Sequence, residues 1–527
     1  MMRVLCIVVG AVVISASALD CTAVPAPGSP HTAHPAALIN GAPSDPESDG
    51  VVRVIADVEC SGFLITNQWA ITARHCVSSA LAAQPQQITV FLGGTRVQPA
   101  QMATVTEVHR SAAGPDLALL HLSVPLNVNG APSGYLQREY PTSNNPGQSF
   151  TCTGWGAAGS QNPRPDGPNS ALLLLGSISP PLLGFRPPVL GQQDMATGDA
   201  GGPCIGDLVA WRAAIGLIGG VYTDGTGAAI DLTAPAIRSW MESVLVQVDP
   251  EVPAQAASIP FAISPDGQQI NIFWVDDLGQ MNQSQLSPDA PSVVIGASED
   301  DPFAAARPAA VYLRGDLHIL GTTVSGGVLE GVSSGGAGVS TWSGIDMPAI
   351  ASGLGISSQG ADAFDVFARS VAGPVAQAFF VARRWFPYEL IGGSFDEDVL
   401  PLWSQSDNYG NSIHVFGVSQ GHVGHKWQRD TDAYWQPAGD DWLFGDVTGN
   451  VASAISTVQI AELTMDLFAR GTNGHLVHKG YANGFGDEFA DMGVAIPGEP
   501  TAVAAGGTIH IFARNPSGTL WHAHYPR

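Results

Sequence analysis

A short strand-like segment recurs six times in the second half of this chain, and its regular spacing limits the folds available. Apolar and polar side chains alternate within each copy, and the copies start 47, 47, 49, 52 and 44 residues apart. A period of this size is typical of one four-stranded unit per repeat. The six copies are Ile270-Asn271-Ile272-Phe273, Leu317-His318-Ile319-Leu320, Phe364-Asp365-Val366-Phe367, Ile413-His414-Val415-Phe416, Met465-Asp466-Leu467-Phe468 and Ile509-His510-Ile511-Phe512.

The last two copies continue into a second strand. Phe468-Ala469-Arg470 is followed by Gly474, and Phe512-Ala513-Arg514 is followed by Gly518, each before another apolar run. Glycine at that place indicates a hairpin turn. Antiparallel hairpins at this period favour a β-propeller over a helical solenoid. We therefore expect residues 259–527 to form a propeller of roughly six blades, in which strand exchange between the two ends could close the ring.

These Phe-Ala-Arg strands resemble those of bacterial lectin-like β-propellers, including fucose-binding ones. In such lectins, arginines and aromatic rings between blades hold sugar hydroxyls and stack on the sugar. The resemblance implies cell-surface glycans as partners and a set of candidate sugar-binding residues. The alternative is that the tryptophans pack in blade cores and the arginines act as struts between blades. The candidates are Arg369, Arg470, Arg514, Trp427 and Trp521.

The first half carries three short motifs in order. Thr72-Ala73-Arg74-His75-Cys76 contains an imidazole, Asp116 opens an apolar run to Leu120, and residues 198–203 read Gly-Asp-Ala-Gly-Gly-Pro. With Gly154-Trp155-Gly156 and the segment around Ile237–Trp240, these motifs resemble the trypsin/chymotrypsin family of serine proteases in its chain order. The resemblance implies a chymotrypsin-like double β-barrel over residues 38–248, and hence an all-β chain with the propeller.

The family places its nucleophilic serine at the position that Ala200 occupies here. By the same resemblance, His75 is the general base and Asp116 orients it. The backbone N–H groups of Gly198 and Ala200 would form the oxyanion hole, which needs no side chain. A methyl group cannot attack a carbonyl carbon. The sequence therefore predicts a protease site that keeps its base and loses its nucleophile.

Two further roles follow from the resemblance. Asp194 occupies the base of the specificity pocket, where an acid selects Arg or Lys; the alternative is an ordinary loop aspartate, since Ala196 replaces the usual neighbouring cysteine. Leu38 begins a segment similar to the mature amino terminus, whose freed amine would pair with Asp199. Because Ala37 precedes Leu38, activation by a trypsin-like cut is not expected.

Cysteines and the N-terminus predict export. Arg3, the apolar run up to Ile14 and Ala16-Ser17-Ala18 have the pattern of a signal peptide over residues 1–18, which a bacterial-type secretion route would recognise. The resemblance to the protease family implies the disulfides Cys60–Cys76 and Cys152–Cys204, which suit an oxidising compartment. Cys21 is left over; it is either lipidated, as in a lipoprotein, or a free or removed thiol.

Charge and composition limit the partners. The formal net charge of −25 over 527 residues argues against nucleic acid, because phosphates would be repelled. No apolar run is long enough for a transmembrane span. We expect no cofactor and no metal.

The predicted order is signal peptide 1–18, linker or pro-segment 19–37, protease-like domain 38–248, linker 249–258 and propeller 259–527.

Two functions remain open on these grounds. One is a secreted protease homologue that binds a peptide or protein without efficient cleavage and attaches to a surface through its propeller. The other is an active endopeptidase, cleaving after Arg or Lys, in which the natural serine has been substituted in this chain. Retention of His75, Asp116 and Asp194 supports the second, and the retained signal peptide supports a natural alanine.

Overall fold

The first barrel is a closed sheet of six strands in the order β2-β3-β4-β7-β6-β5, counted over the described part of the chain. In a computed structural model of the protein, these strands are β2 (Val51–Ile55), β3 (Glu59–Leu64), β4 (Trp69–Thr72), β5 (Thr89–Gly94), β6 (Pro99–Arg110) and β7 (Ala118–Leu122). Two 3₁₀ turns, Arg74–Cys76 and Pro85–Gln87, and helix α2 (Ser79–Ala82) connect β4 to β5. The inward side chains, among them Val52, Ile71 and Leu119, are fully buried and fill the barrel.

The structure describes residues 42–43, 50–112, 115–128, 145–156, 166–188, 195, 198–208, 211–221, 227–287, 291–296, 301–334, 339, 341–360, 362–404, 410–432, 434–445, 447–461, 464–482 and 488–526. Residues 34–527 belong to one compact unit. Among the described residues, no helix has both the length and the apolar character needed to cross a membrane.

The second barrel follows the same plan. Its strands run in the order β9-β10-β13-β12-β11-β8, pairing of β8 with β9 closes the sheet, and β1 (Ala42–Pro43) adds to β9. The other bounds are β8 (Ser149–Gly154), β9 (Asn169–Ser179), β10 (Leu182–Arg186), β11 (Pro203–Leu208), β12 (Trp211–Val221) and β13 (Gly227–Asp231). Helix α3 (Pro235–Leu245) follows, and it contains the segment predicted around Ile237–Trp240. The expected double barrel is thereby confirmed.

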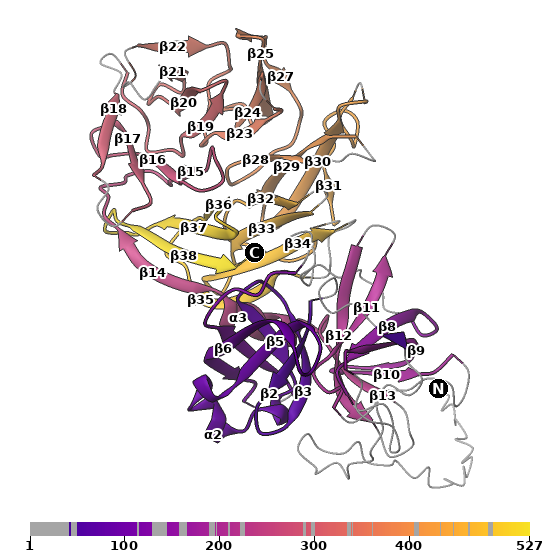
Figure 1. The fold of residues 1–527 in the computed structure, drawn as a ribbon. Helices are drawn as coiled ribbons and strands as arrows, with labels where there is room; N and C mark the ends of the chain where they lie inside the picture. Colours follow the sequence, from indigo (N-terminus) through magenta and orange to yellow (C-terminus); the bar gives the residue numbers. More distant parts are fainter. Residues whose placement is uncertain are drawn as a thin grey trace, which may run out of the picture. The chain divides into compact units, whose positions relative to one another are not determined.

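Six further sheets form the six-bladed propeller within the described residues (Figure 1). Every repeated segment from the sequence lies in the second strand of a blade. The blades are β15 (Phe261–Ile263), β16 (Asn271–Val275), β17 (Met281–Gln285) and β18 (Val293–Gly296); β19 (Ala309–Leu313), β20 (Asp316–Thr322), β21 (Val328–Ser334) and β22 (Trp342–Ile345); β23 (Gly355–Ser358), β24 (Ala363–Arg369), β25 (Val375–Val381), β26 (Arg384–Trp385) and β27 (Glu389–Leu390); β28 (Leu400–Ser404), β29 (Ser412–Ser419), β30 (His422–Arg429) and β31 (Leu443–Phe444); β32 (Ser456–Ala461), β33 (Thr464–Arg470), β34 (His475–Ala482) and β35 (Ala490–Ala495); and β36 (Thr501–Ala505), β37 (Thr508–Arg514) and β38 (Leu520–Pro526) with β14 (Gln247–Val252).

The prediction of a linker over residues 249–258 is wrong in its first part. Strand β14 runs through Val252 and pairs antiparallel with β38, so it completes the sixth blade from the other end of the propeller sequence (Figure 1). Ala256 then forms a bridge with Asp276. Polar and proline residues suggested a linker, but an edge strand tolerates both. The ring is closed by the strand exchange that the repeat pattern allowed.

A buried or partly buried polar pair recurs in every blade. A polar residue in the second strand bonds to one in the third strand 11 or 12 positions later. Such pairing satisfies polar groups that would otherwise be costly to bury. The pairs are Asn271–Gln283, His318–Glu330, Asp365–Gln377, His414–His425, Asp466–His478 and His510–His522.

Candidate active site

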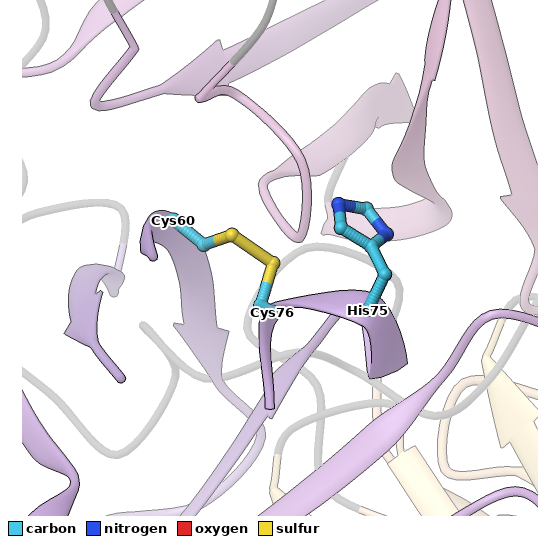
Figure 2. Close-up of side chains that lie close together, drawn as sticks. All are labelled: Cys60, His75 and Cys76. Carbon is cyan, nitrogen blue, oxygen red and sulfur yellow. A yellow bond between two sulfur atoms is a disulfide. The ribbon is translucent and has the colours of Figure 1, made fainter. Parts of the chain in front are cut away.

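His75 lies in the 3₁₀ turn directly after β4, where the Cys60–Cys76 disulfide holds the turn against β3 (Figure 2). The backbone N–H of His75 donates to Asp116 Oδ1 at 2.8 Å, and its ring Nδ1 is in a short contact with Asp116 Oδ2. Asp116 lies two residues before the start of β7, which pairs with β4. Adjacent strands of one barrel thus bring the imidazole and the carboxylate together, as the motif order predicted.

The His75–Asp116 pair is arranged so that Nε2, the ring nitrogen facing away from Asp116, can transfer a proton. Burial alone would raise the pKa of Asp116, but hydrogen bonds and charge from His75, with charge from Arg74, hold that pKa below its usual range. Asp116 is therefore ionised near neutral pH and can stabilise an imidazolium. The His75 side chain is 47% exposed, and within the described residues Nε2 has no partner. Its second nitrogen can therefore act on a ligand.

Cys60, His75 and Cys76 place one nitrogen and two sulfur atoms within 4.8 Å of one another, a grouping that could suggest a metal site. The two sulfurs are joined in a disulfide, as Figure 2 shows. Metal binding needs thiolates, which a disulfide does not offer. His75 next to an oxidised pair does not fit a metal ion.

Ala200 sits in a tight turn between two glycines with left-handed backbone, Gly198 (φ 94°) and Gly201 (φ 89°). The Ala200 carbonyl accepts from the Ser61 N–H at 2.9 Å. A Cβ on Gly201 would collide with the Ser61 carbonyl and the Thr72 hydroxyl, so only glycine lets the turn approach the first barrel this closely. Ala200 is 5% exposed and belongs to the same apolar core as Cys76.

The turn also presents backbone donors. Within the described residues, no acceptor meets the N–H groups of Gly198 and Ala200, the two donors expected for an oxyanion hole. Asp199 between them is almost fully buried, and its Oδ1 accepts from the Gly156 N–H at 3.0 Å. The Cys152–Cys204 disulfide links the adjacent strands β8 and β11 just beyond the turn. This arrangement can bind a carbonyl or oxyanion, but the Ala200 side chain supplies no attacking oxygen.

Several predicted residues lie outside the described part of the chain. These are Asp194 of the specificity pocket, Leu38 of the activation ion pair, Cys21 and the predicted signal peptide. Their roles stay predictions.

The five candidate sugar-binding residues lie on strands β24, β30, β33, β37 and β38, in four different blades. The arginine side chains donate to backbone carbonyls, as with Arg470 to Ile496 at 3.3 Å and Arg514 to Ala256 at 2.6 Å. Arg369 does the same to Ala351 at 3.3 Å, and Trp521 is only 9% exposed in an apolar core. Trp427 is half-buried beside His425. These contacts favour the alternative, in which the arginines connect neighbouring blades and the tryptophans pack in blade cores.

A pocket between the fourth and fifth blades has no counterpart in the sequence patterns. This pocket has a volume of about 520 Å³. Phe444, 49% exposed, offers an aromatic surface, while His422, Asn450 and Thr472 offer hydrogen-bonding groups and Glu488 a carboxylate. Its residues come from loops and from strands β30 and β31 rather than from the repeated segments. The repeat period marks only those segments and therefore misses the pocket.

Comparison with known proteins links part of this chain to a protease family. Residues 38–241 match the trypsin family. Two peptidases from strains of Corynebacterium glutamicum are 30% identical over 179 residues, which is 30% of this chain and 54% of each relative, so the chain spans about half of their length. A serine protease of Scolopendra subspinipes is 27% identical over 208 residues, 35% of this chain and 72% of the relative.

A solved structure, that of a scabies mite inactivated protease paralogue, matches with 15% identity and a TM-score of 0.32, covering 37% of this chain and 92% of that one. The strand order of the two barrels and the sequence match agree with each other. Residues 38–241 of this chain match the trypsin family and form a double β-barrel, and a six-bladed β-propeller follows them.

Proposed function

We propose that the trypsin-like domain binds a peptide or protein without cleaving it efficiently. The observation that carries the proposal is the Ala200 methyl group in a turn shaped by two left-handed glycines. A covalent mechanism needs an oxygen or sulfur nucleophile within reach of the base. The His75–Asp116 pair and the backbone donors of Gly198 and Ala200 still suit binding of a polarised carbonyl group.

A neighbouring hydroxyl does not replace the missing one. Ser61 pairs with Ala200 through its backbone, but its hydroxyl donates to the Gly198 carbonyl at 3.0 Å and accepts from the Trp155 N–H at 2.8 Å. These two bonds hold the Ser61 side chain beneath the turn. What remains is the rate enhancement from binding and the oxyanion hole, on the order of 10³–10⁴-fold over water.

The second candidate is an active serine endopeptidase whose nucleophilic serine was substituted by Ala200 in this chain, so that one hydroxyl would restore its activity. The specific observation in its favour is the intact pairing of His75 with Asp116 through both the backbone and the ring. Its expected specificity for Arg or Lys rests on Asp194 and stays a prediction.

One experiment tests the first proposal and also examines the second. Hydrolysis of peptide libraries is measured for the natural chain and for Ala200→Ser, side by side. We expect no cleavage above background from the natural chain. A gain of cleavage after Arg or Lys in Ala200→Ser would show that the remaining machinery is intact. No gain would remove the restorable-endopeptidase candidate, while brisk turnover by the natural chain would contradict the binding proposal.

We further propose that the propeller attaches the protein to a glycan or protein surface through the pocket beside Phe444. An aromatic face with surrounding hydrogen-bonding groups suits a sugar ring. Glycan-array binding by the full chain tests this, with Phe444→Ala as the loss variant and Phe386→Ala as a control, since Phe386 is 42% exposed in another blade. An array without signal would remove the glycan proposal.

We propose that the protein acts outside the cytoplasm. Its two described disulfides and its trypsin-like relatives support this location outside the cytoplasm. Mass analysis of the mature chain after expression in a secreting host would test cleavage after Ala18 against lipidation of Cys21. An uncleaved chain retained in the cytoplasm would contradict export.

A further inference from the structure

Among the hydrogen bonds of the described residues, a residue from outside the propeller joins the polar pair of the fifth blade. His478 Nε2 bonds to Asp466 Oδ1 at 2.6 Å, within the blade. His478 Nδ1 lies 3.3 Å from Glu242 Oε1, and Glu242 belongs to α3, 236 residues earlier in the chain. All three side chains are nearly inaccessible, with the His478 side chain 1% exposed.

The network is charged at its centre. Burial alone would lower the pKa of His478, but the carboxylates of Glu242 and Asp466 outweigh this effect and raise that pKa to about 9. Among the described residues, two aromatic rings also lie beside the imidazole: Phe468 stacks at 4.9 Å between ring centroids, and Tyr525 of β38 lies at 5.5 Å. A buried cation between two carboxylates is stable only while its partners stay in place.

The backbone is also shaped for the approach of α3. Gly493 in β35 has a left-handed backbone (φ 71°), and a Cβ there would lie 2.8 Å from the Cβ of Ser243 on α3. Apolar residues extend the contact, because one core cluster contains the buried face of α3 together with side chains of the fifth and sixth blades. These residues include Ile237, Met241, Leu245, Phe468, Leu476, Met492 and Tyr525.

We propose that Glu242, His478 and Asp466 form a clasp that fastens α3 to the fifth blade, so that the trypsin-like domain and the propeller unfold as one cooperative unit. The domains of many chains are joined by exposed linkers and move independently. Here a charged network, a glycine-dependent close approach and a shared apolar core all oppose separation. Whatever the propeller binds then fixes the orientation of the His75 site. This inference is independent of whether the Ala200 site cleaves.

Glu242→Ala is the informative variant, because it removes α3 from the network while His478 and Asp466 keep each other, as in the other blades. Gly493→Ala tests the close approach separately. Gly315→Ala is its matched control, since Gly315 has a similar backbone (φ 88°) but no atom within 4 Å of the Cβ that alanine would add. Any strain from a left-handed alanine is then common to both glycine variants.

Calorimetry of the full chain provides the readout. We expect one unfolding transition for the natural chain and for Gly315→Ala, and two transitions for Glu242→Ala combined with Gly493→Ala, separated by about 5 °C or more. Both described disulfides lie in the trypsin-like domain. Mild reduction of the disulfides therefore identifies which unfolding transition belongs to that domain. Two transitions in the natural chain would overturn the proposal, and so would a single transition in the double variant.

Discussion

His75 and His478 are both paired with carboxylates, yet their surroundings differ. His75 is half exposed, uses one nitrogen for Asp116 and leaves Nε2 without a partner in the described structure. His478 is buried and uses both nitrogens, one for each acid. The same side-chain chemistry therefore serves two purposes. An open nitrogen suits proton transfer to a ligand, whereas two occupied nitrogens suit a structural lock.

The largest expected effect concerns activity and separates the two histidines. If Ala200→Ser gains peptide hydrolysis, adding His75→Ala should reduce kcat/KM by roughly 10³-fold or more, back to the level of the Ala200 chain, because the serine loses its base. Adding His478→Gln to Ala200→Ser should change kcat/KM far less and lower the unfolding temperature instead. Equal losses of kcat/KM in both combinations would break the distinction between the open and the occupied imidazole.

The disulfides give the next effect, in stability. Replacing Cys152 and Cys204 by alanine should lower the free energy of unfolding by about 4 kcal/mol, and replacing Cys60 and Cys76 by about 3 kcal/mol, because the closed loops span 52 and 16 residues. Urea unfolding measures both. Removing the Cys60–Cys76 disulfide should also loosen the turn that carries His75. In Ala200→Ser, this removal should therefore reduce hydrolysis by more than the loss of stability alone would explain.

The pH dependence of stability sharpens the role of His478. Its folded pKa of about 9 lies above the ordinary value of 6.5, so its contribution is fully present below pH 6.5 and is lost as the pH rises toward 9. The loss should be on the order of 3 kcal/mol at most. Urea unfolding between pH 6 and 9.5 should show this decline in the natural chain, and a smaller one in Glu242→Ala. Identical pH profiles would argue against a charged network.

The smallest effect concerns an uncharged pair. Gln283→Leu in the first blade leaves Asn271 without its partner at 3.1 Å and should destabilise the chain by about 1–2 kcal/mol, with little dependence on pH. Urea unfolding at pH 7 and pH 9 tests both points. A loss that varied strongly with pH would show that the charge of His478 is not what sets the fifth blade apart.

The sequence predicted the parts of the structure that depend on local pattern. The repeated segments identified six blades because each copy, such as Met465–Phe468, carries the same alternation into the second strand of its blade. Motif order predicted the barrels and brought His75 next to Asp116. It could not predict the polar pairs, since their third-strand members are Gln, Glu or His and share only a spacing.

Contacts between residues far apart in the chain could not be predicted from the sequence, because no local pattern marks the two partners. Glu242 and His478 are 236 residues apart, and nothing in either segment indicates a buried acid or cation. Residues Asp249–Val252 looked like a linker because their pairing partner lies at the far end of the propeller sequence. The arginines of the Phe-Ala-Arg strands suggested sugar contacts, and the structure shows that Arg470 and Arg514 each use Nε to donate to a backbone carbonyl; their sugar-binding role stays a prediction.

The central claim is that Ala200 leaves a trypsin-like site able to bind and unable to cut. Its most direct test is kcat/KM for a peptide substrate, measured on the natural chain and on Ala200→Ser under identical conditions. We predict background hydrolysis for the natural chain and an increase of roughly 10³-fold or more when the hydroxyl is restored. Hydrolysis by the Ala200 chain well above background, or formation of a covalent acyl adduct on it, would contradict the claim.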